Sequence, residues 1–85
     1  TPLEQRISEV ENTILQLEEE LEKNNQDLIQ ASTKGDGELI ARLAKRNSEI
    51  SMEVEELYTE LTGLTEKYEQ ATQHFEEELN RLGTG

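Results

Sequence analysis

The sequence predicts an all-α protein folded as a two-helix antiparallel coiled-coil hairpin. Three observations predict this fold. Apolar residues recur in alternating steps of three and four, glutamate is abundant while proline occurs once, and the periodicity breaks at a short glycine-containing segment. Residues at this spacing form a seam along one side of a helix. A change of phase at glycine favours a turn between two helices over one long helix.

A first helix is expected at about residues 2–32. Thr1 is a suitable N-cap, Pro2 suits the first helical position, and Glu4 completes a capping box. In the heptad lettered a to g, the seam has Ile7, Ile14, Leu21 and Leu28 at a, and Leu3, Val10, Leu17, Asn24 and Ala31 at d. Asn24 is therefore the polar exception on an otherwise apolar stripe.

A turn is expected at about residues 33–37, followed by a second helix at about 38–82. Gly35 and Gly37 are poor residues for a helix interior, and Asp36 can cap the helix that follows. The second seam has Ile40, Asn47, Val54, Leu61, Tyr68 and Phe75 at a, and Leu43, Ile50, Leu57, Leu64 and Ala71 at d.

Folding the chain back at the turn matches the two stripes layer by layer. When Ala31 lies opposite Ile40, every layer is apolar except the one in which Asn24 meets Asn47. A buried amide without a partner costs about 1–3 kcal/mol, so a slip by one heptad is penalised. Asn24 and Asn47 are therefore a candidate pair for setting the register. The alternative is a hydrated layer that the fold merely tolerates.

Composition and charge exclude several classes of function. The chain has 85 residues, no cysteine and a net charge of −12. Its apolar content is too low for a large globular core, and the lack of cysteine excludes disulfides and thiolate metal sites. The negative charge disfavours DNA binding. No apolar run is long enough to cross a bilayer. We expect a segment of a larger protein that has no membrane contact.

No reaction chemistry can be assigned to the residues. His74 is the only histidine and falls at a g position, where a surface role is expected. The two EEE segments, 18–20 and 76–78, lie on a rod without the kind of pocket in which carboxylates act as acids and bases. The segment KGDG lacks the spacing of a phosphate-binding loop. We therefore expect no enzymatic activity, cofactor, metal or small-molecule ligand.

Positive charge gathers around the predicted turn. Residues 23–46 carry five basic and three acidic residues, a charge of +2, whereas the remainder carries three basic and seventeen acidic residues, a charge of −14. The candidate RNA-contact residues at this tip are Lys34, Arg42, Lys45 and Arg46, which can reach phosphates of a structured RNA. The alternative is an ordinary solvated helix end. On the flank of the seam, Asp27 is expected to face Arg46.

Several apolar residues have no partner in this fold. The second helix is the longer one, so its last apolar residues have no counterpart on the first; Leu15, Ile29 and Tyr58 lie off the seam. The candidate protein contacts are Tyr58, Phe75, Leu79 and Leu82. The alternative is single exposed apolar groups, which are common on protein surfaces.

The segment EVEELYTELTGL at residues 53–64, within an acidic helical hairpin that has a short polar turn, resembles the C-terminal coiled-coil extension of ABC-F family ATPases. Those proteins have two tandem ATP-binding cassettes and no membrane domain, and many act on the ribosome. The resemblance covers nearly the whole chain. It implies a cytoplasmic C-terminal appendage of a larger protein that helps its parent bind ribosomal RNA. Leu61 stands where family members often carry an aromatic residue.

Two functions are therefore expected. The first is a non-catalytic ribosome-binding appendage of a soluble ABC-F-like ATPase, with the basic tip in contact with RNA. The alternative is a structural coiled coil of an unrelated protein, which binds other coiled coils or domains of its parent. In the alternative, a second copy of the chain can also be the partner.

Overall fold

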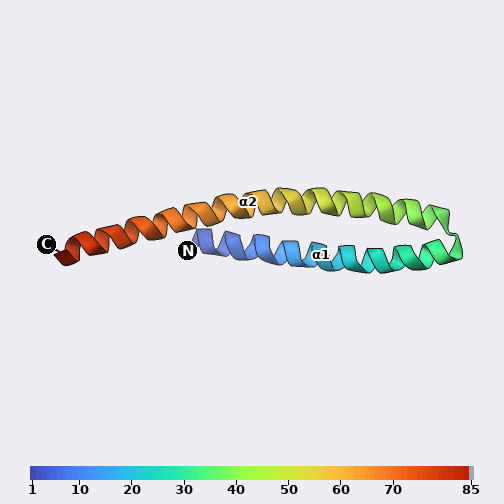
Figure 1. Ribbon diagram of the computed structural model, residues 1–85, viewed down its shortest axis with the longest axis horizontal. Coiled ribbons are helices and arrows are strands. Elements are labelled where there is room, and N and C mark those ends of the chain that lie inside the picture. The colour runs from blue at the N-terminus through green and yellow to red at the C-terminus, as the bar shows by residue number, and fades with distance from the viewer. Residues whose placement is uncertain (85) are drawn as a thin grey trace.

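The computed structural model describes residues 1–84 and shows two antiparallel α-helices joined by a tight turn (Figure 1). Helix α1 spans Pro2–Lys34 and helix α2 spans Gly37–Thr84. The molecule is a rod of 74 × 16 × 15 Å. Its length is that of α2, because 48 residues at a rise of 1.5 Å extend for about 72 Å. The predicted all-α helical hairpin is confirmed.

Helix α1 is capped at both ends by interactions that its sequence provides. At the start, the Thr1 hydroxyl accepts a hydrogen bond from the Glu4 backbone N–H at 3.3 Å. At the end, Gly35 adopts the left-handed conformation, with φ 71° and ψ 26°. This conformation turns the Gly35 N–H to the Ser32 carbonyl and the Asp36 N–H to the Ala31 carbonyl, at 3.3 and 3.0 Å. The pattern is a Schellman motif, which satisfies carbonyls that the helix end would otherwise leave unpaired.

Helix α2 begins directly after this motif, because Asp36 caps it. The Asp36 carboxylate accepts a hydrogen bond from the Leu39 backbone N–H at 3.1 Å. Gly37 becomes the first residue of α2, and Gly35 is the only glycine with positive φ among the described residues. The connection therefore consists of residues 35–36, whereas the sequence predicted a turn over about 33–37. The C-cap of α1 and the N-cap of α2 are consecutive residues, so the chain reverses without a longer loop.

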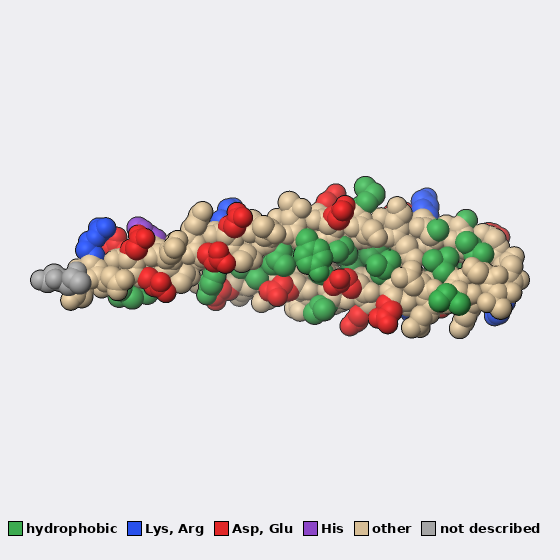
Figure 2. Space-filling view, viewed as in Figure 1, with side chains coloured by type: hydrophobic (Ala, Val, Ile, Leu, Met, Phe, Trp, Pro, Cys, Tyr) green, Lys and Arg blue, Asp and Glu red, His purple; other side chains and the backbone are tan. Residues whose placement is uncertain are grey.

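The core is the seam between the two helices. Its buried apolar side chains are Val10, Ile14, Leu17, Ala31 and Ile50. The other apolar a and d residues up to Leu64 are half-buried, because a pair of helices can cover only one side of each helix, and Tyr68, Ala71 and Phe75 are exposed. Figure 2 shows apolar side chains along the line between the helices. The buried and half-buried seam residues fall on the predicted a and d positions up to Leu64.

Helix α2 continues past the start of α1 (Figure 1). It has 48 residues against 33 in α1, a difference of fifteen residues or about 22 Å. Helix α1 begins beside Tyr68, since Thr1 and Leu3 line one shallow hollow together with Tyr68, Ala71 and Phe75. We call residues 69–82 of α2 the overhang. Its first residues border the start of α1, and the remainder extends past α1.

The two glycines of the turn provide a matched test of the caps. A Cβ at position 35 or at position 37 meets no atom within 4 Å, so only backbone conformation matters. We expect Gly35→Ala to lower the free energy of unfolding by about 1–2 kcal/mol, because alanine is strained in the left-handed region. Gly37→Ala should raise it by about 0.5 kcal/mol, because alanine restricts the unfolded chain. Urea denaturation followed by circular dichroism measures both values, and equal effects of the two substitutions would contradict the assigned cap.

Candidate interaction surfaces

Two arginine–glutamate pairs join the helices along one flank of the seam. The Arg6 guanidinium donates two hydrogen bonds to the Glu60 carboxylate, at 2.6 and 2.9 Å. The Arg46 guanidinium does the same to Glu20, at 2.6 and 3.0 Å. All four residues occupy g positions, and we call this side the g flank. The pairs lie two heptads apart on both helices, so one register holds between them.

These pairs shift the pKa values of the groups that form them. The hydrogen bond from Arg6 lowers the pKa of Glu60, and that from Arg46 lowers the pKa of Glu20, with a smaller contribution from the Asn24 amide. Each carboxylate in turn raises the pKa of its arginine. The side chains remain 37–49% exposed, so water and salt screen both pairs. The pairs therefore select a register more than they add stability.

The partner of Arg46 differs from the expectation. The sequence suggested Asp27, whereas the structure places Arg46 against Glu20. In an antiparallel pair, g residues of one helix meet g residues of the other, and the observed register brings Asp27 to Leu39. Asp27 and Leu39 are both half-buried and line one small hollow near the turn. The expectation was wrong because it paired residues by charge without counting along the flank.

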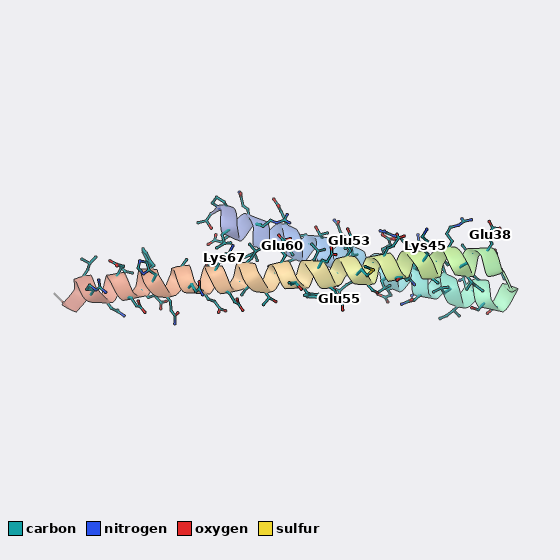
Figure 3. The ribbon with its side chains drawn as sticks, turned by 90° about the horizontal axis from the view of Figure 1, so that it is seen from above. Glu38, Lys45, Glu53, Glu55, Glu60 and Lys67 are labelled. Carbon is teal, nitrogen blue, oxygen red and sulfur yellow. The ribbon has the colours of Figure 1, made fainter. Side chains whose placement is uncertain are left out.

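The structure separates the four predicted tip residues into two groups. Arg42 lies 3.7 Å from Glu38 on its own helix, and Arg46 is held by Glu20. Lys34 and Lys45 form no ion pair within the part of the chain that the structure describes. Lys34 ends α1, and Lys45 lies on the outer edge of α2 (Figure 3). Only these two lysines are therefore available at the tip without breaking an existing pair.

The side chains of the asparagine layer contact neighbours outside the predicted pair. Asn24 is buried and Asn47 is half-buried, but their amides point to different neighbours. The Asn47 amide donates to the Asn25 side-chain oxygen at 3.1 Å, while Asn24 interacts with Glu20. The Asn47 side-chain oxygen is buried without a protein partner. The register role of Asn24 and Asn47 stays a prediction.

The contact of Asn25 with Asn47 was not predicted from the sequence. The e position of Asn25 places this residue beside the layer of Asn47, and this position was the available signal. The heptad pattern alone does not show that the Asn47 amide turns to Asn25 and not to Asn24, because this choice depends on side-chain rotamers.

The four predicted protein contacts fall in two places. Phe75, Leu79 and Leu82 lie together on the overhang and are 64, 52 and 77% exposed. Tyr58 lies in the middle of the hairpin, where it lines a hollow between α1 and α2 with Leu15. The structure therefore offers two separate apolar surfaces.

Two further properties concern the residues that the structure describes. Neither helix contains a stretch apolar enough and long enough to pass through a bilayer. Within residues 1–84, histidine, aspartate and glutamate side chains do not gather in threes as a metal site would require.

Comparison with known proteins finds no match to a family model, to a curated protein or to a solved structure. The resemblance to ABC-F extensions stays a prediction that rests on residues 53–64.

The ion pairs predict a pH dependence. Because the folded pKa of Glu20 lies below its ordinary value of about 4.3, the pair stabilises the fold above that pH, and this contribution is lost as pH falls through the folded pKa. We expect Glu20→Gln to melt at a lower temperature than Glu19→Gln at pH 7, and the two to converge near pH 2. Both variants remove one charge, and Glu19 forms no ion pair among residues 1–84. A difference that persists at pH 2 would contradict the assigned pair.

Proposed function

We propose that the hairpin is a non-catalytic protein-interaction module and that it binds its partner through the overhang of α2. The observation that supports this proposal is an apolar stripe on α2 that continues past the start of α1 (Figure 1). It consists of Ala71, Phe75, Leu79 and Leu82, all of which are exposed. The stripe continues the a and d positions of α2, which α1 covers from Leu3 to the turn.

The spacing of the stripe suits contact with another helix. Steps of four, four and three residues keep all four side chains within a sector of about 80° on an α-helix. They span eleven residues, or about 17 Å. Burying a leucine or phenylalanine fully contributes about 1.5–3 kcal/mol, so covering this stripe is strongly favourable. A helix laid along it would continue the line of α1, as amphipathic helices do in apolar grooves.

Photo-crosslinking tests this proposal. The photoreactive residue p-benzoylphenylalanine replaces Phe75 in one variant and Glu77 in another; Glu77 lies about 160° around the helix from Phe75. We expect protein adducts from position 75 and not from position 77 when the full-length protein is irradiated in cells. Adding Leu79→Glu should lower the yield at position 75 roughly tenfold, because it removes a buried contact. Equal yields at the two positions would contradict the proposal.

A second candidate function is RNA contact through the tip, as the ABC-F resemblance implies. Lys34 and Lys45 support it, because they are cations near the turn that no carboxylate of the described chain neutralises. The Arg46 guanidinium adds little support, since contact with RNA would compete with Glu20 at 2.6 Å.

Charge reversal tests the tip. We expect Lys34→Glu with Lys45→Glu to weaken ribosome association of the full-length protein, because two phosphate contacts become repulsive. Lys23→Glu with Lys67→Glu changes the net charge equally and places neither reversal at the turn, so it serves as the control. Arg46 is left unchanged, because its reversal would also disturb the fold. Equal association of the two variants, measured by ribosome co-sedimentation, would contradict the role of the tip.

A further inference from the structure

The basic residues are absent from one side of the hairpin between residues 4 and 72. All eight lysines and arginines occupy c, f or g positions of the heptad. The e and b positions between residues 4 and 72 contain no lysine or arginine. They contain six glutamates, which are Glu4, Glu11, Glu18, Glu22, Glu55 and Glu69. We call the surface formed by these e and b residues the acidic face.

The acidic face is one continuous side of the rod. In an antiparallel pair, e residues of the two helices adjoin each other just as g residues do, and b residues lie next to them. The observed g-to-g ion pairs place the acidic face on the opposite side of the seam. Figure 3 shows Glu55 on the opposite edge of α2 from Glu53, Glu60 and Lys67. In Figure 2, apolar and acidic groups share the middle of the visible face, and the blue groups lie at its edges and ends.

An apolar hollow lies near the middle of this face. It bridges the two helices and is lined by Glu11, Ile14, Leu15, Glu18, Tyr58 and Leu61. Leu15 and Tyr58 are 59 and 46% exposed, although both are large apolar side chains. The hollow therefore combines an apolar floor supplied by the seam with walls supplied by Leu15 and Tyr58.

The carboxylates around the hollow are not paired with arginine, unlike those on the g flank. There, Glu20 and Glu60 each receive two hydrogen bonds from an arginine. In the described chain, no lysine or arginine forms an ion pair with any of the six glutamates of the acidic face. The rim of the hollow therefore carries net negative charge, and Glu11 and Glu18 stand about 10 Å apart along α1.

We propose that the acidic face binds a basic amphipathic helix of a partner protein. The helix presents apolar side chains to Leu15 and Tyr58, and lysine or arginine to Glu11 and Glu18. Charge complementarity selects this occupant. A second copy of the chain would bring the same carboxylates against themselves, and nucleic acid would be repelled by them. The site is separate from the overhang and does not depend on the function proposed for it.

A defined peptide tests this proposal. The probe is a fluorescein-labelled, 18-residue helical peptide with leucine on one face and lysine on the other, and fluorescence anisotropy measures its binding to the 85-residue chain. We expect saturable one-to-one binding. Leu15→Ser with Tyr58→Ser should weaken it at least tenfold, because two apolar contacts are lost. Met52→Ser should not, although Met52 is 62% exposed, because it occupies an f position. Circular dichroism confirms that the variants remain helical.

A charge-matched pair gives an independent reading. Glu18→Gln should weaken binding several-fold more than Glu19→Gln, because Glu18 borders the hollow and Glu19 lies at an f position. Absence of binding, or equal binding by all these variants, would overturn the proposal. So would loss of binding with Phe75→Glu, which would place the peptide on the overhang. Sedimentation of the unsubstituted chain gives a further check. If that chain is a dimer and the variant with Leu15→Ser and Tyr58→Ser is a monomer, a second copy occupies the hollow and the proposal is overturned.

Discussion

The antiparallel register between α1 and α2 is the constraint on which the other features depend. It is set where the chain reverses, since the connection has only two residues. Gly35 ends α1 in the left-handed conformation and Asp36 caps α2. A slip by one heptad would require both caps to open and several residues to leave the helices. The layers of the seam, the asparagine layer and the ion pairs all follow from this turn.

The register also sorts the charges. Because g residues meet g residues and e residues meet e residues, each helix contributes to two unlike sides of one rod. Arginine and glutamate meet on the g flank and satisfy each other there. The acidic face receives carboxylates and exposed apolar groups without cations. Three surfaces result, namely the tip, the overhang and the acidic face, and they lie far enough apart along the rod or around it to act separately.

The fold could be predicted because its determinants are local and repeated. The heptad pattern identifies the seam without knowledge of contacts, and Asp36 is recognisable as a cap from its position before a helical stretch. The surfaces were predicted less completely. Arg46 was assigned to Asp27, because the flank pairs depend on the register of the seam and on heptad position together. Asn25 was overlooked, because the hydrogen bonds of two neighbouring amides depend on side-chain rotamers that a pattern does not specify.

The turn was predicted longer than it is for a related reason. Both glycines were placed in the turn because both are poor residues for a helix interior. In the structure, the positive φ of Gly35 is enough to reverse the chain, so α1 continues to Lys34 and α2 begins at Gly37. The division between free and occupied cations at the tip also depends on the register, which brings Glu20 to Arg46. Composition alone counts such residues as equivalent.

Spin-label distances test the register most directly. The chain has no cysteine, so nitroxide labels can be placed at chosen positions only. One sample carries labels at exposed Ser8 and Thr65, and the other at Ser8 and Thr72. We predict a shorter distance for Ser8 with Thr65 than for Ser8 with Thr72, and this distance should not change when unlabelled protein is added in excess. A shorter distance for Ser8 with Thr72, or a signal that disappears on dilution because two chains exchange helices, would contradict this prediction.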